Sequence, residues 1–179
     1  MPEQIGSHEQ SAKHLAARAV MAYRAGLPVV LISVNGSSGH SSGIVCDWKG
    51  QRDSFHNDEK LLVRAFAFIY IGSIVDQAIS DPISDELRKE LAFEMSDALE
   101  ARQTAVDWGL AKAVAETNPF AHSGFKLASR LFRMDQPLID SLARELVSQG
   151  TIEGDALRSW LNANANTLNF DELETRTTY

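Results

Sequence analysis

The chain has 179 residues, of which 44% are hydrophobic and 23% charged, and its formal net charge is −7. This length suits one domain with a core of its own, and the negative charge disfavours nucleic acid and anionic lipid as partners because both are polyanions. The single cysteine, Cys46, excludes an internal disulfide and a zinc site built from several cysteines.

Membrane attachment is not expected. The first ten residues are polar and contain no apolar signal-peptide core. The most apolar stretch, residues 61–75, is interrupted by Arg64, and the uninterrupted part is too short to span a bilayer. The sequence therefore predicts a cytoplasmic protein without a membrane partner.

The first predicted helix begins at Ser7, which forms a capping box with Gln10, and ends before Gly26. The side of this helix that lies opposite its apolar stripe carries His14 and Arg18, among residues that are otherwise hardly polar. The pattern is typical of a buried helix, in which these two side chains need partners. The apolar stripe follows helical spacing: Ala12, Leu15, Ala16, Ala19 and Tyr23.

A β-hairpin is predicted after this helix. Val29–Val34 is short and rich in β-branched residues, a loop rich in glycine and serine follows, and Ile44–Trp48 returns. A second long helix is expected from Asp58 to Ile79. Because residues 65–75 are almost all apolar, this helix should lie at the centre of the core.

Further helices are expected in the second half of the chain. Ser84 and Ser96 resemble N-caps, and Asp97 stands in the first turn after Ser96. That helix has small and apolar residues on the face that carries Asp97. Pro119 is expected to end this region.

Three shorter helices complete the predicted domain. The first covers residues 124–134, the second is capped by Asp135 and ends at Gly150, and the third covers residues 153–161. The remaining residues are polar and are predicted to be largely disordered. The expected organisation is a mainly α domain over residues 1–161, with one β-hairpin near its N-terminus, and a tail over residues 162–179.

The segment SAKHLAARAV, residues 11–20, has the frame of a zinc-protease helix. In such helices His-Glu-x-x-His places two metal ligands on one face, and the glutamate acts as general base. Here His14 keeps the first ligand position, Leu15 occupies the general-base position, and Arg18 occupies the second ligand position.

Together with later motifs, this segment resembles the zinc peptidase domain of the FtsH-type AAA+ metalloproteases. IGSIVDQ is similar to the family's G-G-R-x-A-E segment, with Gly72 retained and Asp76 in place of glutamate. MSDALEARQTA is similar to its S-x-D-x-x-x-A-T segment, with Asp97 at the position of the third zinc ligand. The resemblance covers residues 11–161 and implies the multi-helix fold of that peptidase domain, with its hairpin.

The substitutions predict that the domain is non-catalytic and holds no cofactor. Leu15 cannot accept a proton from a metal-bound water, and Arg18 cannot ligate a metal. We expect Arg18 to form an ion pair with Asp97, next to His14, where zinc would otherwise bind. The family holds its substrate by β-addition, which implies peptide binding along the hairpin strand: Val29, Val30, Leu31, Ile32, Ser33 and Val34.

Three functions remain open on the sequence. The favoured one is a degenerate peptidase-like domain that binds a peptide or protein partner, or forms a homo-oligomer, as the ring-forming family implies. The second is an active metal-dependent peptidase with rearranged zinc ligands, in which His8 or His40 contributes. The third is a helical interaction protein unrelated to peptidases.

Overall fold

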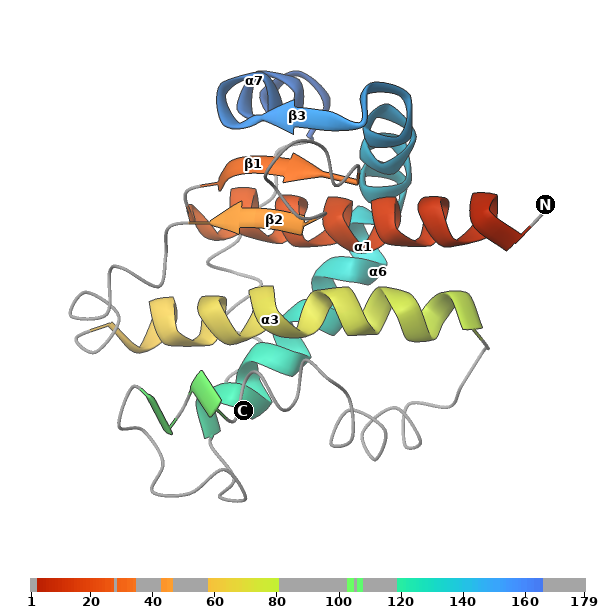
Figure 1. Cartoon of the computed structure of the whole chain (residues 1–179). Coiled ribbons are helices and arrows are strands. Elements are labelled where there is room, and N and C mark those ends of the chain that lie inside the picture. Colours follow the sequence, from red (N-terminus) through yellow and green to blue (C-terminus); the bar gives the residue numbers. More distant parts are fainter. Residues whose placement is uncertain are drawn as a thin grey trace.

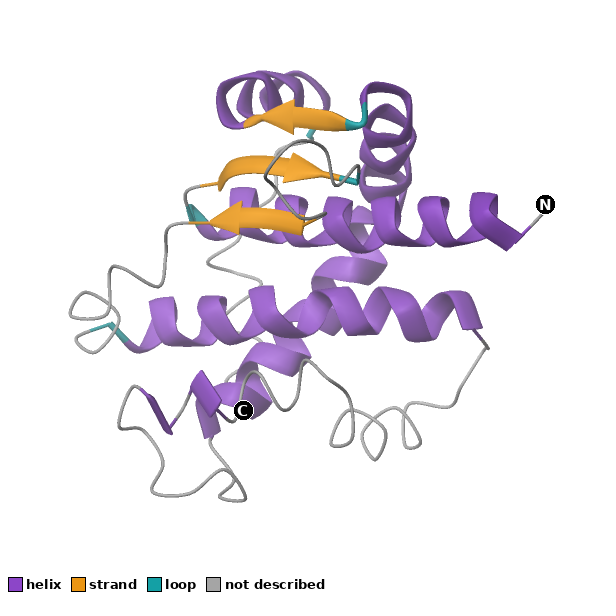
Figure 2. Ribbon diagram, viewed as in Figure 1, coloured by secondary structure: helices purple, strands orange, loops and turns teal. Residues whose placement is uncertain are grey.

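The computed structural model describes residues 3–27, 29–34, 43–46, 58–80, 103–104, 106–107 and 119–165. These residues form a mainly helical fold with a small sheet (Figures 1 and 2), which confirms the predicted fold class. Ser84, Ser96 and Asp97 lie outside them. The helices are α1 (Glu3–Ala25), α3 (Glu59–Ser80), α6 (Pro119–Gln149) and α7 (Gly154–Asn164), and the strands are β1 (Val29–Ser33), β2 (Gly43–Cys46) and β3 (Thr151–Glu153).

Three long helices build the core. Figure 1 shows α1 and α3 side by side, with α6 crossing behind both, and each pair is in contact. The predicted apolar stripe of α1 is buried, apart from the half-buried Tyr23. The centre of α3 is also buried, from Ala65 to Val75, which confirms the central place predicted for this helix. None of the helices among the described residues is long and apolar enough to cross a bilayer.

The structure confirms the predicted C-terminal end of α1 but not its predicted N-terminal end. The helix begins at Glu3, so Ser7 lies inside it, and the predicted capping box with Gln10 is wrong. The C-terminal end follows the prediction. Gly26 has φ +71°, its N–H donates to the carbonyl of Tyr23, and the N–H of Leu27 donates to the carbonyl of Ala22. This is a Schellman motif, and it turns the chain into β1.

Helix α6 is continuous where two helices were predicted. It runs through Asp135 and Pro137 without a break, so Asp135 caps no helix, and Pro119 opens a helix at its first position. The Asp135 carboxylate is buried and forms a bidentate ion pair with Arg24 of α1, at 2.8 Å to Nε and 2.9 Å to Nη2. Gly150, at φ +75°, ends α6 as predicted.

The sheet has one strand more than the predicted hairpin. Its order is β2-β1-β3, and β1 pairs antiparallel with both neighbours. Ile32 pairs with Ile44 on one side and with Ile152 on the other. Helix α7 follows β3 directly and continues to Asn164, beyond Leu161, the predicted end of the domain.

Candidate functional site

The face of α1 that carries His14 and Arg18 packs against α3. The two helices run in opposite directions: His14 contacts Asp76, Arg18 contacts Ile69, and near the end of α1 the carbonyl of Ala25 accepts a hydrogen bond from Arg64. His14 and Arg18 therefore lie on one face, as their spacing predicts. This shared face of α1 and α3 is the candidate site.

The His14 imidazole is held by Asp76. Its Nδ1 atom lies 2.8 Å from the Asp76 Oδ2 atom, and the two side chains are 25% and 38% exposed. Gly72, one turn before Asp76, makes room for the ring. A Cβ atom on Gly72 would lie 2.3 Å from His14 Cε1 and 2.4 Å from Nε2, which is far inside van der Waals contact. The ring thus occupies the space that a side chain on α3 would fill.

Arg18, which the resemblance matches to the second metal-ligand position, is anchored to α3 by its guanidinium. The Nη2 atom donates a hydrogen bond of 3.2 Å to the carbonyl of Ile69, and Cζ lies 5.4 Å from the centroid of the Phe68 ring. That distance is within the range of a cation–π contact. A carbonyl dipole and an aromatic face therefore stabilise the cation.

The position that the resemblance assigns to the general base, Leu15, is apolar and buried. Leu15 is 7% exposed and belongs to the hydrophobic core, together with Ala16 and Ala19 of the same helix. A leucine in this environment neither polarises nor deprotonates water. Its burial contributes roughly 1.5–3 kcal/mol to folding, so the residue has a structural role here.

The donor set of the described residues does not fit a catalytic zinc ion. Such a site needs three protein ligands and an open position for water. Within the part of the chain that the structure describes, no three His, Cys, Asp or Glu side chains are grouped to hold a metal. Arg18 adds a positive charge one turn from His14, which repels a metal cation. Asp97, the third ligand position and the predicted partner of Arg18, lies outside the described residues.

The strand predicted to bind peptide has no free edge along its paired residues. Leu31, Ile32 and Ser33 pair with β2 on one side and with β3 on the other. β-Addition needs a row of unpaired backbone groups, and these three residues do not offer one in the structure. The Ser33 hydroxyl also lies 2.7 Å from the Thr151 hydroxyl, and this hydrogen bond adds a side-chain link between β1 and β3.

Comparison of the chain with protein-family models, curated proteins and solved structures finds no match. The resemblance to FtsH-type peptidases therefore rests on the motifs themselves. The contact between His14 and Asp76 joins two of those motifs. Sequence reasoning had matched Gly72 and Asp76 to the family without predicting that they receive the imidazole. Their spacing of four residues, on one face of a helix, was the available signal.

A double-mutant cycle tests the fit of the ring over Gly72. Gly72→Ala should destabilise the protein because the new methyl group displaces the His14 ring from Asp76. In a His14→Ala background the same change should stabilise by up to about 1 kcal/mol, since alanine is the better helix former. We expect a coupling free energy of about 1–3 kcal/mol, measured by urea unfolding. A coupling below about 0.5 kcal/mol would contradict the contact.

Proposed function

We propose that this chain is a degenerate zinc-metallopeptidase-like domain of the FtsH type, without peptidase activity, that acts by binding a peptide or protein partner or by self-association. The observation that carries the proposal is the anchoring of Arg18. Its guanidinium, at a metal-ligand position, hydrogen-bonds the carbonyl of Ile69 and stacks on Phe68.

Two losses make catalysis by the family's mechanism untenable. The general base contributes roughly 10²–10⁴-fold to the rate of such reactions, and Leu15 cannot replace it. The metal supplies the activated water, and the cation of Arg18 at a ligand position disfavours metal binding. In this proposal α1 still packs against α3 at the site, but the general base and the metal ion that catalysis requires are missing.

The family frame gains support from the contact between α1 and α3. His14 and Asp76 were matched to two separate family motifs, they are 62 residues apart in the chain, and they lie within hydrogen-bonding distance. Gly72, the third matched position, has no side chain, and the His14 imidazole occupies the space beside it. A chance match of short motifs would not require these three residues to meet.

One observation favours the second candidate, an active metal-dependent peptidase with rearranged ligands. Metal-binding histidines are commonly oriented by a carboxylate on the other ring nitrogen, and Asp76 holds His14 in this way. In this candidate the Nε2 atom of His14 would be the metal ligand. This candidate needs at least two further ligands and a base that replaces Leu15.

Casein hydrolysis separates the two candidates. The purified chain, supplied with zinc, should cleave casein no faster than a buffer blank, and a chelator should change nothing. His14→Ala serves as the matched variant, because it removes the histidine at the first ligand position of the resemblance. Cleavage that chelator abolishes and that His14→Ala also abolishes would overturn the proposal in favour of the active peptidase. Cleavage shared by both proteins would reveal a contaminating protease, and the measurement is then repeated on material free of it.

A further inference from the structure

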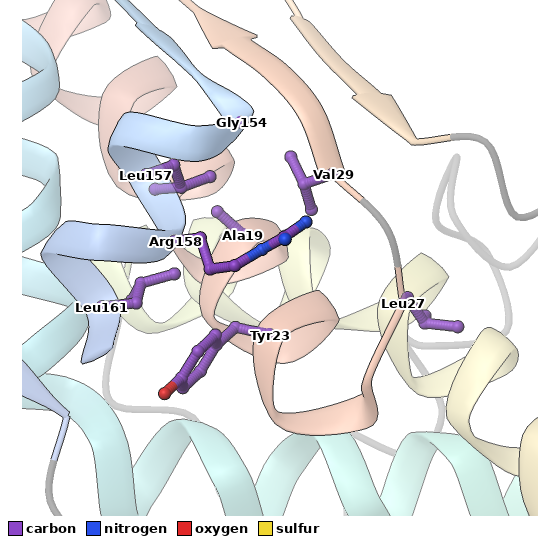
Figure 3. Close-up of a pocket in the computed structure, with 8 residues that line it drawn as sticks. All are labelled: Ala19, Tyr23, Leu27, Val29, Gly154, Leu157, Arg158 and Leu161. Atoms are coloured by element: carbon purple, nitrogen blue, oxygen red, sulfur yellow. The ribbon is translucent and has the colours of Figure 1, made fainter.

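A small cavity lies on the other side of α1, between its C-terminal turns, the beginning of β1 and α7 (Figure 3). Its volume is about 40 Å³. Most of its walls are aliphatic: Ala19, Leu27, Val29, Leu157 and Leu161. The Tyr23 hydroxyl donates a hydrogen bond of 2.8 Å to Asn162 Oδ1, which holds α1 against α7 on one side of the cavity.

A cation lies across this apolar cavity. Figure 3 shows the Arg158 side chain extending from α7 over the cavity toward Val29. Arg158 is exposed, and among the residues that the structure describes it forms neither an ion pair nor a side-chain hydrogen bond. A guanidinium presents a planar fork of donors that matches a carboxylate. Its donors are therefore available to an anionic ligand.

The size of the cavity restricts what enters it. A dry apolar cavity that holds benzene measures roughly 150 Å³, so a volume near 40 Å³ accepts only a small aliphatic group. A nucleotide or an organic cofactor is excluded on size. The ligand must place a short aliphatic side chain in the cavity and a carboxylate only a few bonds away, at Arg158. The C-terminal residue of a polypeptide has this arrangement, because its carboxylate and its side chain are attached to the same Cα atom.

We propose that Arg158 and the adjoining cavity bind the C-terminal residue of a partner polypeptide, with a small aliphatic side chain such as valine in the cavity and the α-carboxylate on the guanidinium. Capture of a terminal carboxylate is a recurrent mode of peptide recognition. The site is separate from the candidate metallopeptidase face, because Ala19 and Tyr23 point toward α7, whereas His14 and Arg18 contact α3. The proposal for the Arg158 site can therefore be tested independently of the proposed loss of zinc binding.

The test is a titration of the full chain with short peptides, followed by NMR of the leucine methyl groups in the cavity. Acetyl-Gly-Gly-Val with a free carboxylate should bind at least about tenfold more tightly than its C-terminal amide, since the amide lacks the negative charge that pairs with the guanidinium. Acetyl-Gly-Gly-Gly with a free carboxylate should bind more weakly, because it leaves the cavity empty.

Arg158→Gln should abolish the preference for the acid over the amide while the valine methyl groups still contact the cavity. Arg144→Gln is the matched control, because Arg144 is an exposed arginine whose Nε donates a hydrogen bond to the carbonyl of Asp140 in its own helix. It should keep the full preference. The proposal is overturned if acid and amide bind equally to the unmodified chain, if glycine binds as well as valine, if Arg158→Gln keeps the preference, or if millimolar peptide leaves the methyl signals unchanged.

Discussion

Asp135→Ala should lower the free energy of unfolding by about 3–5 kcal/mol, because it leaves the Arg24 guanidinium buried without its counter-ion. The side chains of Arg24 and Asp135 are only 6% and 4% exposed, and the two bonds between them are short. Desolvation of the arginine is compensated in the native state by this carboxylate. Thermal unfolding should shift down by roughly 10 °C for a chain of this length.

Two comparisons isolate the cause of that effect. Lys13→Ala breaks the ion pair of Lys13 with Asp140, which joins the same two helices but is 23% and 42% exposed, and it should cost less than about 1 kcal/mol. Arg24→Met combined with Asp135→Leu removes both charges and should recover most of the stability. If Asp135→Ala proves no more harmful than Lys13→Ala, the buried pair is not what joins α1 to α6.

Gly124→Ala should destabilise the protein by about 3 kcal/mol, although alanine is normally the better residue inside a helix. Gly124 lies where α6 crosses α3. A Cβ atom there would lie 2.5 Å from the Cβ of Phe66 and 2.8 Å from the backbone nitrogen of Ala67. Backbone atoms cannot move aside as the His14 ring can at Gly72, so the helices must separate.

Ser148→Ala is the control for Gly124→Ala, because Ser148 is exposed on the same helix and its replacement tests helix propensity alone. It should change stability by less than about 0.5 kcal/mol. Both variants are compared by urea unfolding, with the slope recorded to show that the unfolded states are alike. A Gly124→Ala protein as stable as the unmodified chain would mean that the two helices do not approach so closely.

Local patterns were enough to predict the two long helices α1 and α3. The stripe from Ala12 to Tyr23 was predicted from its helical spacing, the buried centre of α3 from its almost wholly apolar composition, and the end of α1 from Gly26. Elements that depend on distant partners were missed. Asp135 has the local character of a helix cap, but its partner Arg24 is 111 residues away and holds it inside a continuous helix. β3 has only three residues and exists because β1 offers it an edge.

The candidate site was predictable to the same extent. Helical spacing placed His14 and Arg18 on one face, which the structure confirms. The residue that holds His14 was not predicted, because nothing local to α1 shows which later helix packs against it. Arg18 contacts Ile69 and Phe68 on α3, and sequence reasoning had considered only carboxylates as its partners. Because every residue has a main-chain carbonyl, the sequence does not show which one will accept the hydrogen bond.

The most direct test of the account is the zinc content of the purified chain beside that of the variant Leu15→Glu/Arg18→His, both equilibrated with zinc and passed through metal-free buffer. We expect the unmodified chain to retain far less than one zinc per molecule and the variant, which contains a complete His-Glu-x-x-His motif, to bind zinc tightly. One zinc per unmodified molecule, lost on His14→Ala, would contradict the loss of the metal centre.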